Sequence, residues 1–193
     1  MAKKKIRKSK KQKSTPRQKM LSDGWREKAP VLKFTGAFIV ATVAFFLITN
    51  AAWFSKVTTP LLEIYTSISS GILNVFGMDT LARGDVLVSN DFSVNVEEGC
   101  DAVAPAILYV VSILVFPMKW RFKWIGLMAG LATIFILNII RILTLFLTGV
   151  YAQSLFDLMH VEIWQALFIV FIVVMWLYWL KWATAKSAEY AKS

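Results

Sequence analysis

Long apolar runs separated by short charged segments dominate the chain, and their lengths predict helices that cross a membrane. The uncharged run 34–54 measures about 31 Å as an α-helix, enough to cross the hydrocarbon core of a bilayer. Three later runs are bounded by charged residues and contain few polar ones. The pattern therefore predicts an all-α integral membrane protein with about four transmembrane helices, at residues 34–54, 102–117, 125–147 and 163–180.

The segment 61–77 has a different, amphipathic pattern. Its apolar residues recur at helical spacing: Leu61, Ile64, Tyr65, Ile68, Ile72 and Val75. Such a stripe is typical of a helix that lies in the membrane interface, here on the outer side. A fifth transmembrane helix is the alternative, but it would place the basic loop 118–124 outside. Further on, 86–88 and 92–96 flank the turn residues 89–91 and predict a short extracytoplasmic β-hairpin.

Charge is concentrated at the amino terminus. The chain is 57% apolar or aromatic, with a mean hydropathy of +0.57 and a formal net charge of +10. Of its 22 Lys and Arg residues, 13 fall in residues 1–33, which we interpret as a disordered basic tail. We expect this tail to bind anionic lipids of the inner leaflet, where each basic residue contributes about 1 kcal/mol. Nucleic acid is the weaker alternative and is not expected, because no RNA-binding pattern accompanies the charge.

The same charges predict which side of the membrane each segment faces. If the tail is cytoplasmic, the loop 118–124 and the C-terminal tail 183–193 are cytoplasmic too, and 19 of the 22 basic residues lie inside. Nine of the 12 acidic residues then fall in the two outside segments. We therefore expect a protein of the cytoplasmic membrane, with a membrane domain at 34–182 and both termini in the cytoplasm.

Cys100 is the only cysteine, so the chain forms no internal disulfide. It directly precedes Asp101, a residue suited to the N-cap of the helix predicted at 102–117. The positive end of the helix dipole favours the reactive thiolate at this point. Glu97, Glu98 and Asp101 oppose it by raising the pKa of the thiol, so a reactive cysteine needs a nearby cation. A plain packing role is the alternative, since cysteine is often buried.

Arg141 lies inside the third predicted transmembrane helix, where a charged residue costs about 2.5–3.5 kcal/mol at the centre of a span. A charge retained at that cost suggests a function. Asn138 precedes it by three residues on the same helical face and is expected to help aim the guanidinium group. The alternative is that the long side chain of Arg141 snorkels to the interface.

His160 is the only histidine and lies just before the fourth predicted helix. Beside a cysteine, a neutral imidazole can take the thiol proton and later return it to a leaving amine. By itself it is an ordinary interfacial histidine, and a metal site is not expected because no second His or Cys exists. The charge pattern nevertheless assigns Cys100, Arg141 and His160 to one face of the membrane, and this coincidence favours an active site.

Three short motifs carry these residues: Glu98-Gly99-Cys100-Asp101-Ala102, Asn138-Ile139-Ile140-Arg141 and Met159-His160-Val161. With them, the region from Glu98 to Gln165 resembles the exosortase and archaeosortase family, small multi-span cysteine transpeptidases with a Cys, an Asn-x-x-Arg and a His at corresponding points. Many members carry a small residue and a glycine after the cysteine, where this chain has Asp101-Ala102.

The resemblance implies a membrane enzyme that cleaves the C-terminal sorting signal of secreted proteins, which consists of a recognition motif, a hydrophobic span and a basic end. It implies Cys100 as nucleophile, His160 as general acid and base, and Arg141 as stabiliser of the thiolate or oxyanion, with neither a metal nor a cofactor. The acyl group passes to water or to an acceptor. Two alternatives remain at this point: a non-catalytic membrane scaffold and a small transporter.

Overall fold

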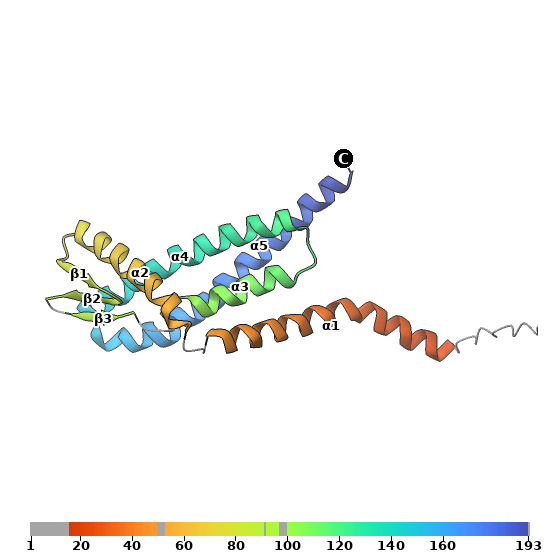
Figure 1. The fold of residues 1–193 in the computed structure, drawn as a ribbon, viewed down its shortest axis with the longest axis horizontal. Helices are drawn as coiled ribbons and strands as arrows, with labels where there is room; N and C mark the ends of the chain where they lie inside the picture. The colour runs from red at the N-terminus through yellow and green to blue at the C-terminus, as the bar shows by residue number, and fades with distance from the viewer. Residues whose placement is uncertain (1–15, 50–52, 91, 97–99, 193) are drawn as a thin grey trace, which may run out of the picture. The chain divides into compact units, whose positions relative to one another are not determined.

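The computed structural model describes residues 16–49, 53–90, 92–96 and 100–192 of the 193-residue chain. It is mostly helical and carries one small sheet (Figure 1). In chain order the elements are α1 (Pro16–Thr49), α2 (Ser55–Val75), β1 (Thr80–Arg83), β2 (Val86–Ser89), β3 (Ser93–Asn95), α3 (Val103–Val115), α4 (Trp120–Tyr151), the 3-10 turn η1 (Gln153–Leu155), the π-helical turn η2 (Leu158–Ile163) and α5 (Trp164–Lys192).

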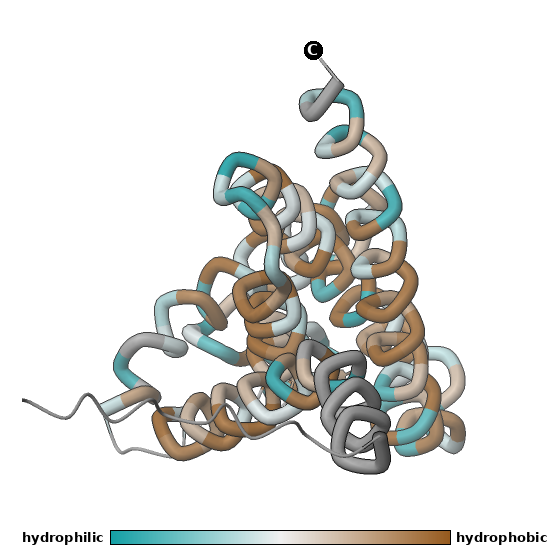
Figure 2. The backbone as a smooth tube through the Cα atoms, turned by 90° about the vertical axis from the view of Figure 1, so that its right-hand side faces the viewer, coloured by the Kyte–Doolittle hydropathy of each residue, from teal (hydrophilic) through white to brown (hydrophobic). Residues whose placement is uncertain are grey.

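Among the described residues, three helical segments are long and apolar enough to cross a membrane: Val31–Thr49, Trp120–Tyr151 and Gln153–Tyr190. The integral membrane class predicted from the sequence is therefore supported, and three of the four predicted spans have a counterpart. Many large apolar side chains on these helices face outward, and apolar residues predominate along their turns (Figure 2). That surface suits contact with lipid rather than with water.

The predicted span at 102–117 is not confirmed, because α3 has 13 residues and rises only about 20 Å, against roughly 30 Å for the hydrocarbon core. Both ends are fixed by local chemistry. Ala102 has a left-handed backbone, which cannot continue a helix. Phe116 precedes Pro117, whose ring pushes it to the extended conformation observed there.

The first helix also differs from its prediction at both ends. The span expected at 34–54 ends at Thr49, and α2 already begins at Ser55. The basic tail was expected to be disordered over residues 1–33. Its first 15 residues lie outside the described part of the chain, and from Pro16 onward the tail is helical. Lys, Arg, Gln, Met and Leu are good helix formers, so a high charge alone does not prevent a helix there.

Helices α3, α4 and α5 pack around a common apolar core. Glycines on α4 provide the close contacts: a side chain at Gly126 would collide with the Trp179 ring, and one at Gly130 with the Tyr109 ring. Helices α3 and α5 run opposite to α4, so Phe122 and Trp179 meet at one end of the bundle. We call this the basic end, because Lys119, Arg121 and Lys181 lie there.

The predicted β-hairpin is confirmed, since β2 and β3 pair antiparallel with Leu87 opposite Val94. The sequence prediction missed β1, which pairs antiparallel with β2 to give the strand order β1-β2-β3. Gly84 and Asp85 form the two-residue loop between them, and Gly84 has φ +64°. A glycine that supplies a positive φ is the signal for such a turn.

Helix α2 includes most of the helix predicted at 61–77, and part of the predicted apolar stripe is exposed, as a helix in the membrane interface requires. Of the predicted apolar stripe, Ile64, Ile68 and Val75 are exposed. The buried face is partly polar, because it covers the edge of β1. Ser70 and Asn74 both bond to the backbone of Thr80, and Thr66 donates to the Gly84 carbonyl at 2.6 Å. The hydrogen-bonding needs of a sheet edge, which apolar periodicity does not register, therefore decide how α2 is oriented.

Candidate active site

Cys100 lies three residues before α3, at the end of the bundle opposite the basic end. Asp101 was expected to be the N-cap, but that position is taken by Ala102, whose backbone is left-handed (φ 57°, ψ 17°). Asp101 still caps the helix, since its carboxylate accepts the Val103 N–H at 3.0 Å. Among the described residues, Ala102 is the one non-glycine with a positive φ. Backbone strain of this kind is common beside functional groups.

Cys100, His160 and Arg141 meet at one point. The Cys100 Sγ atom lies 2.7 Å from His160 Nε2, and the Arg141 guanidinium donates to the same sulfur at 3.5 Å. Cys100 and Arg141 are 7% and 6% exposed, whereas His160 is half-buried. The three residues come from the start of α3, the middle of α4 and η2, so tertiary folding brings together groups 41 and 60 residues apart.

The position of Arg141 is stabilised by contacts with α5. Its guanidinium lies 5.7 Å from the centre of the Phe168 ring, a cation–π arrangement. One turn further along α4, Thr144 donates to the Arg141 carbonyl at 2.9 Å and accepts from the Trp164 indole N–H at 3.0 Å. These bonds tie the first turn of α5 to the segment of α4 that carries the arginine.

His160 belongs to the π-helical turn η2, which leads directly into α5. A π-helical turn holds one more residue than an α-turn, and such turns are frequent at functional sites. The His160 ring lies 5.7 Å from the Phe156 ring, with the planes tilted by 40°. The aromatic contact restricts the imidazole on one side while its Nε2 atom faces Cys100.

Asn138 lies one turn before Arg141 on α4 and is completely buried. Neither polar atom of its amide makes a hydrogen bond of good geometry within the described part of the chain. The amide is still near enough to the Tyr65 hydroxyl to lower its pKa, although two stronger influences raise that pKa to about 12, first burial and then the negative charge of Asp101.

Sequence reasoning missed Tyr65 as a neighbour of the site and placed it in an apolar stripe. Its ring stacks on Phe135 of α4 at 4.9 Å, and the side chain is only 3% exposed. The available signal was its hydroxyl group, because a buried tyrosine oxygen needs a polar partner. Tyr65 thereby brings α2 next to Asn138 and Asp101.

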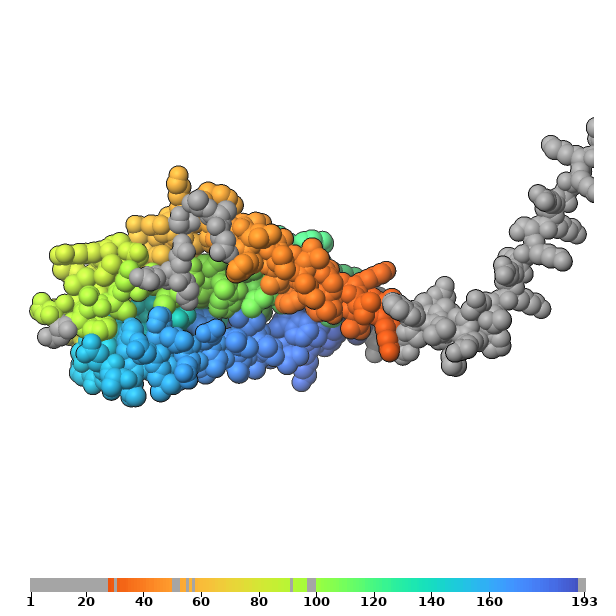
Figure 3. Space-filling view, turned by 90° about the horizontal axis from the view of Figure 1, so that it is seen from below, coloured from red at the N-terminus to blue at the C-terminus, as the bar shows by residue number. Residues whose placement is uncertain are grey.

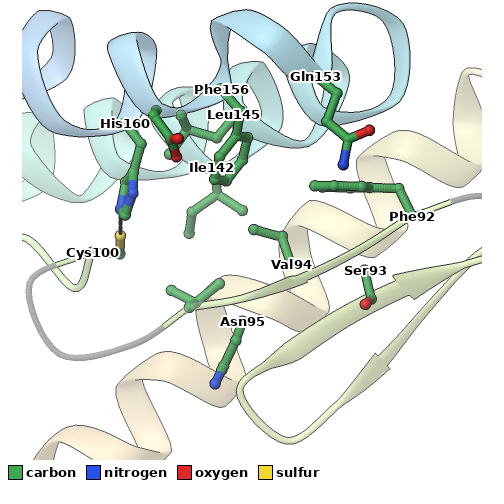
Figure 4. Close-up of a pocket in the computed structure, with 12 residues that line it drawn as sticks. Phe92, Ser93, Val94, Asn95, Cys100, Ile142, Leu145, Gln153, Phe156 and His160 are labelled. Atoms are coloured by element: carbon green, nitrogen blue, oxygen red, sulfur yellow. Dashed lines mark hydrogen bonds between the residues drawn. The ribbon is translucent and has the colours of Figure 1, made fainter.

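A pocket of about 400 Å³ opens beside Cys100 (Figure 4). It lies between β3 and the segment that follows α4, and the surfaces of these two parts adjoin in the space-filling view (Figure 3). The volume is in the range of small-molecule and peptide sites. Its walls are formed by Phe92, Ser93, Val94, Asn95, Val96, Cys100, Ile142, Leu145, Gln153, Phe156, Asp157 and His160.

A thiol in contact with an imidazole, next to a fixed cation and an open pocket, is an arrangement suited to nucleophilic catalysis. The comparison with protein families agrees with this chemistry. The family model for transmembrane exosortases matches residues 33–177, about three quarters of the chain. The chain belongs to the transmembrane exosortase family. We find no significant match among curated proteins or among solved structures.

The exosortase match is longer than the motif region recognised in the sequence. That resemblance covered residues 98–165, whereas the family match also includes α2 and the whole sheet. Membership implies a membrane protein with a cysteine transpeptidase role. The left-handed backbone observed at Ala102 is a conformation that glycine adopts without strain.

Proposed function

We propose that this exosortase cleaves the C-terminal sorting signal of secreted proteins through a thioester on Cys100. The observation that carries the proposal is the 2.7 Å contact between the Cys100 sulfur and His160 Nε2, beside the Arg141 guanidinium. A sorting signal with a hydrophobic span is a substrate that a membrane-embedded enzyme can meet at the edge of the bilayer, where the peptide leaves the lipid.

In the proposed reaction, His160 takes the proton of the Cys100 thiol, and the thiolate attacks the carbonyl carbon of the scissile bond. Negative charge develops on the carbonyl oxygen, and the Arg141 cation stabilises first the thiolate and then this oxyanion. The C–N bond breaks as His160 returns the proton to the leaving amine, which leaves the substrate bound to sulfur as a thioester. Water or an acceptor nucleophile then attacks the thioester and regenerates the thiol.

The length of α4 supports a site at the membrane surface. Arg141 follows Trp120 by 21 residues, which corresponds to about 31 Å along the helix and matches the hydrocarbon thickness. If the basic end lies at the cytoplasmic interface, as the distribution of Lys and Arg favours, Cys100 and its partners lie at the outer interface. The termini are then cytoplasmic, and the basic amino-terminal segment contacts anionic lipids.

Co-expression with secreted proteins that carry a C-terminal apolar anchor tests the proposal. We expect intact-mass measurement to show a shortened or transferred product with the wild-type enzyme and none with Cys100→Ala. The matched control is Ser112→Ala, which removes one polar atom from α3 away from the pocket and should leave processing unchanged. Membrane insertion of each variant is checked by fractionation. Full processing by Cys100→Ala would remove the nucleophile assignment.

A further inference from the structure

The two edges of the three-stranded sheet have different surroundings. At the β1 edge, the backbone of Thr80 bonds to Ser70 and Asn74 of α2, so this edge is covered. At the other edge, β3 borders the pocket that contains Cys100. An edge strand left beside a cavity presents backbone groups that another extended chain can pair with.

The hydrogen-bond pattern shows which backbone groups of β3 face the pocket side. Ser89 donates to the Phe92 carbonyl at 2.8 Å, and Val96 donates to the Asp85 carbonyl at 2.9 Å. In an antiparallel pair, residues alternate between bonding to the partner strand and pointing away from it. Phe92 and Val96 therefore turn their backbone groups toward β2, and the backbone N–H and C=O of Ser93 point to the opposite edge.

The pocket continues along this edge to the nucleophile. Figure 4 shows β3 running below the pocket from Phe92 toward Cys100, with Gln153 and Phe156 on the opposite side. The strand has three residues, which span about 10 Å at the rise of an antiparallel strand. A peptide lying along it would reach from the Ser93 edge to the sulfur in an extended conformation.

We propose that the substrate residues on the amino-terminal side of the scissile bond bind as an added strand along the Ser93 edge of β3. The occupant is a short extended peptide, and the inference rests on the proposed function, because Cys100 fixes where the scissile carbonyl lies. Main-chain hydrogen bonds to β3 supply affinity, and alternate side chains of the peptide face the wall that contains Gln153, Phe156 and Asp157.

Peptide reagents that alkylate Cys100 test this binding mode without a known substrate. The probe is acetyl-tetra-alanyl chloromethyl ketone, and chloroacetone is the reference, with the same electrophile and no peptide. In both reactions the thiolate displaces chloride and forms a thioether, and His160 takes the thiol proton. We expect the peptide to react at least tenfold faster than chloroacetone. Equal rates would contradict the proposal, because the edge would then contribute no binding.

Single N-methylation at each of the four alanines provides the sharper test. Strand addition predicts an effect at alternate positions only. Where the N–H faces β3, methylation removes one hydrogen bond and should slow alkylation roughly tenfold. At the positions between, alkylation should slow less than twofold. A similar effect at all four positions, or at none, would overturn strand addition. Because these measurements use the wild-type enzyme, they do not depend on a variant that folds.

Two substitutions at one position test the strand edge itself. Ser93→Pro removes the outward N–H but none of the bonds to β2, and edge strands tolerate proline. It should lower the ratio of the peptide rate to the chloroacetone rate about tenfold, whereas Ser93→Ala, which keeps the N–H, should lower that ratio less than twofold. If Cys100 reacts with neither reagent, the proposed function itself fails. If it reacts but the peptide rates show no alternation and no effect of Ser93→Pro, only strand addition fails.

Discussion

The two ends of the helical bundle satisfy their buried polar groups in different ways. At the basic end, Lys123 donates to the Leu114 carbonyl at 2.6 Å, and the Trp179 indole donates to the Phe122 carbonyl at 2.9 Å. Toward the middle of the bundle, the Tyr109 hydroxyl donates to the Gly126 carbonyl at 3.0 Å. Each of these groups bonds to the main chain of a neighbouring helix, so each ties two helices together.

At the end that contains Cys100, three reactive side chains also contact one another. The thiol meets the imidazole and the guanidinium, the Asn138 amide has no well-formed bond among the described residues, and Ala102 holds a strained backbone. Bonds between a side chain and the main chain of a neighbouring helix stabilise the fold, whereas the Cys100–His160 and Arg141–Cys100 contacts join reactive side chains. The strained backbone and the unbonded amide fit the proposed catalytic role of this end, since such features occur at functional sites.

The largest effect is expected at His160. His160→Ala removes the proton acceptor and donor, and we expect processing to fall by about 10²–10⁴-fold while the protein still inserts into the membrane. Processing is measured by the intact mass of a co-expressed substrate. Wild-type rates in His160→Ala would show that the histidine contact has no catalytic role.

A slightly smaller loss is expected for Arg141→Gln, which keeps a polar side chain but removes the charge. Loss of one oxyanion-stabilising group costs about 10²–10³-fold in rate. The matched control is Arg83→Gln, because Arg83 is an exposed arginine on β1 and lies outside the pocket. Equal losses in the two variants, measured with the same substrate, would contradict a specific role for Arg141.

At the bundle core the expected change is in stability rather than in rate. Gly130→Ala places a methyl group against the Tyr109 ring, and we expect thermal unfolding in detergent to show a loss of about 1–3 kcal/mol. Processing per folded molecule should stay unchanged. Gly36→Ala is the control, because no other element of the described chain comes within 4 Å of a methyl group added there. If Gly130→Ala kept its stability but lost activity, the view that the bundle core serves stability rather than catalysis would be contradicted.

The strained residue beside the nucleophile should respond in the opposite direction. Ala102→Gly relieves the left-handed backbone, and we expect a gain in stability of about 1 kcal/mol, with processing retained. Gly84→Ala is the matched test at a glycine with a similar positive φ of +64° and should be destabilising. If thermal unfolding shows a loss for Ala102→Gly, strain at this position is not being stored in the fold.

The smallest effect at neutral pH is expected at Tyr65. Because burial raises the pKa of its hydroxyl from 10.0 to about 12, its protonated form favours the folded state. This stability is fully present below pH 10 and is lost as the pH rises from 10 to 12. We expect Tyr65→Phe to lose less stability over that window than the wild type does in thermal melts. Identical losses of stability in Tyr65→Phe and the wild type would contradict the raised pKa of Tyr65.

Sequence alone predicted the membrane class, the β2–β3 hairpin and the residues that meet at the site, because hydropathy, turn residues and motif chemistry are local. It could not predict how short the helical part of the segment 102–117 is, since Ala102 gives no sign of a left-handed backbone. It did not predict the polar contacts of α2, because the polar face of that helix is explained only by β1, a strand contacted in three dimensions. Tyr65 was missed for the same reason.

The alkylation rate of Cys100 as a function of pH tests the central claim most directly, because this thiol is the only one in the chain. Purified protein is treated with iodoacetamide, and the modified fraction is read by intact mass. An activated thiolate predicts rapid reaction at neutral pH in the wild type, with the midpoint of the pH–rate profile displaced upward in Arg141→Gln but not in Arg83→Gln. Superimposable profiles for all three proteins would contradict the account.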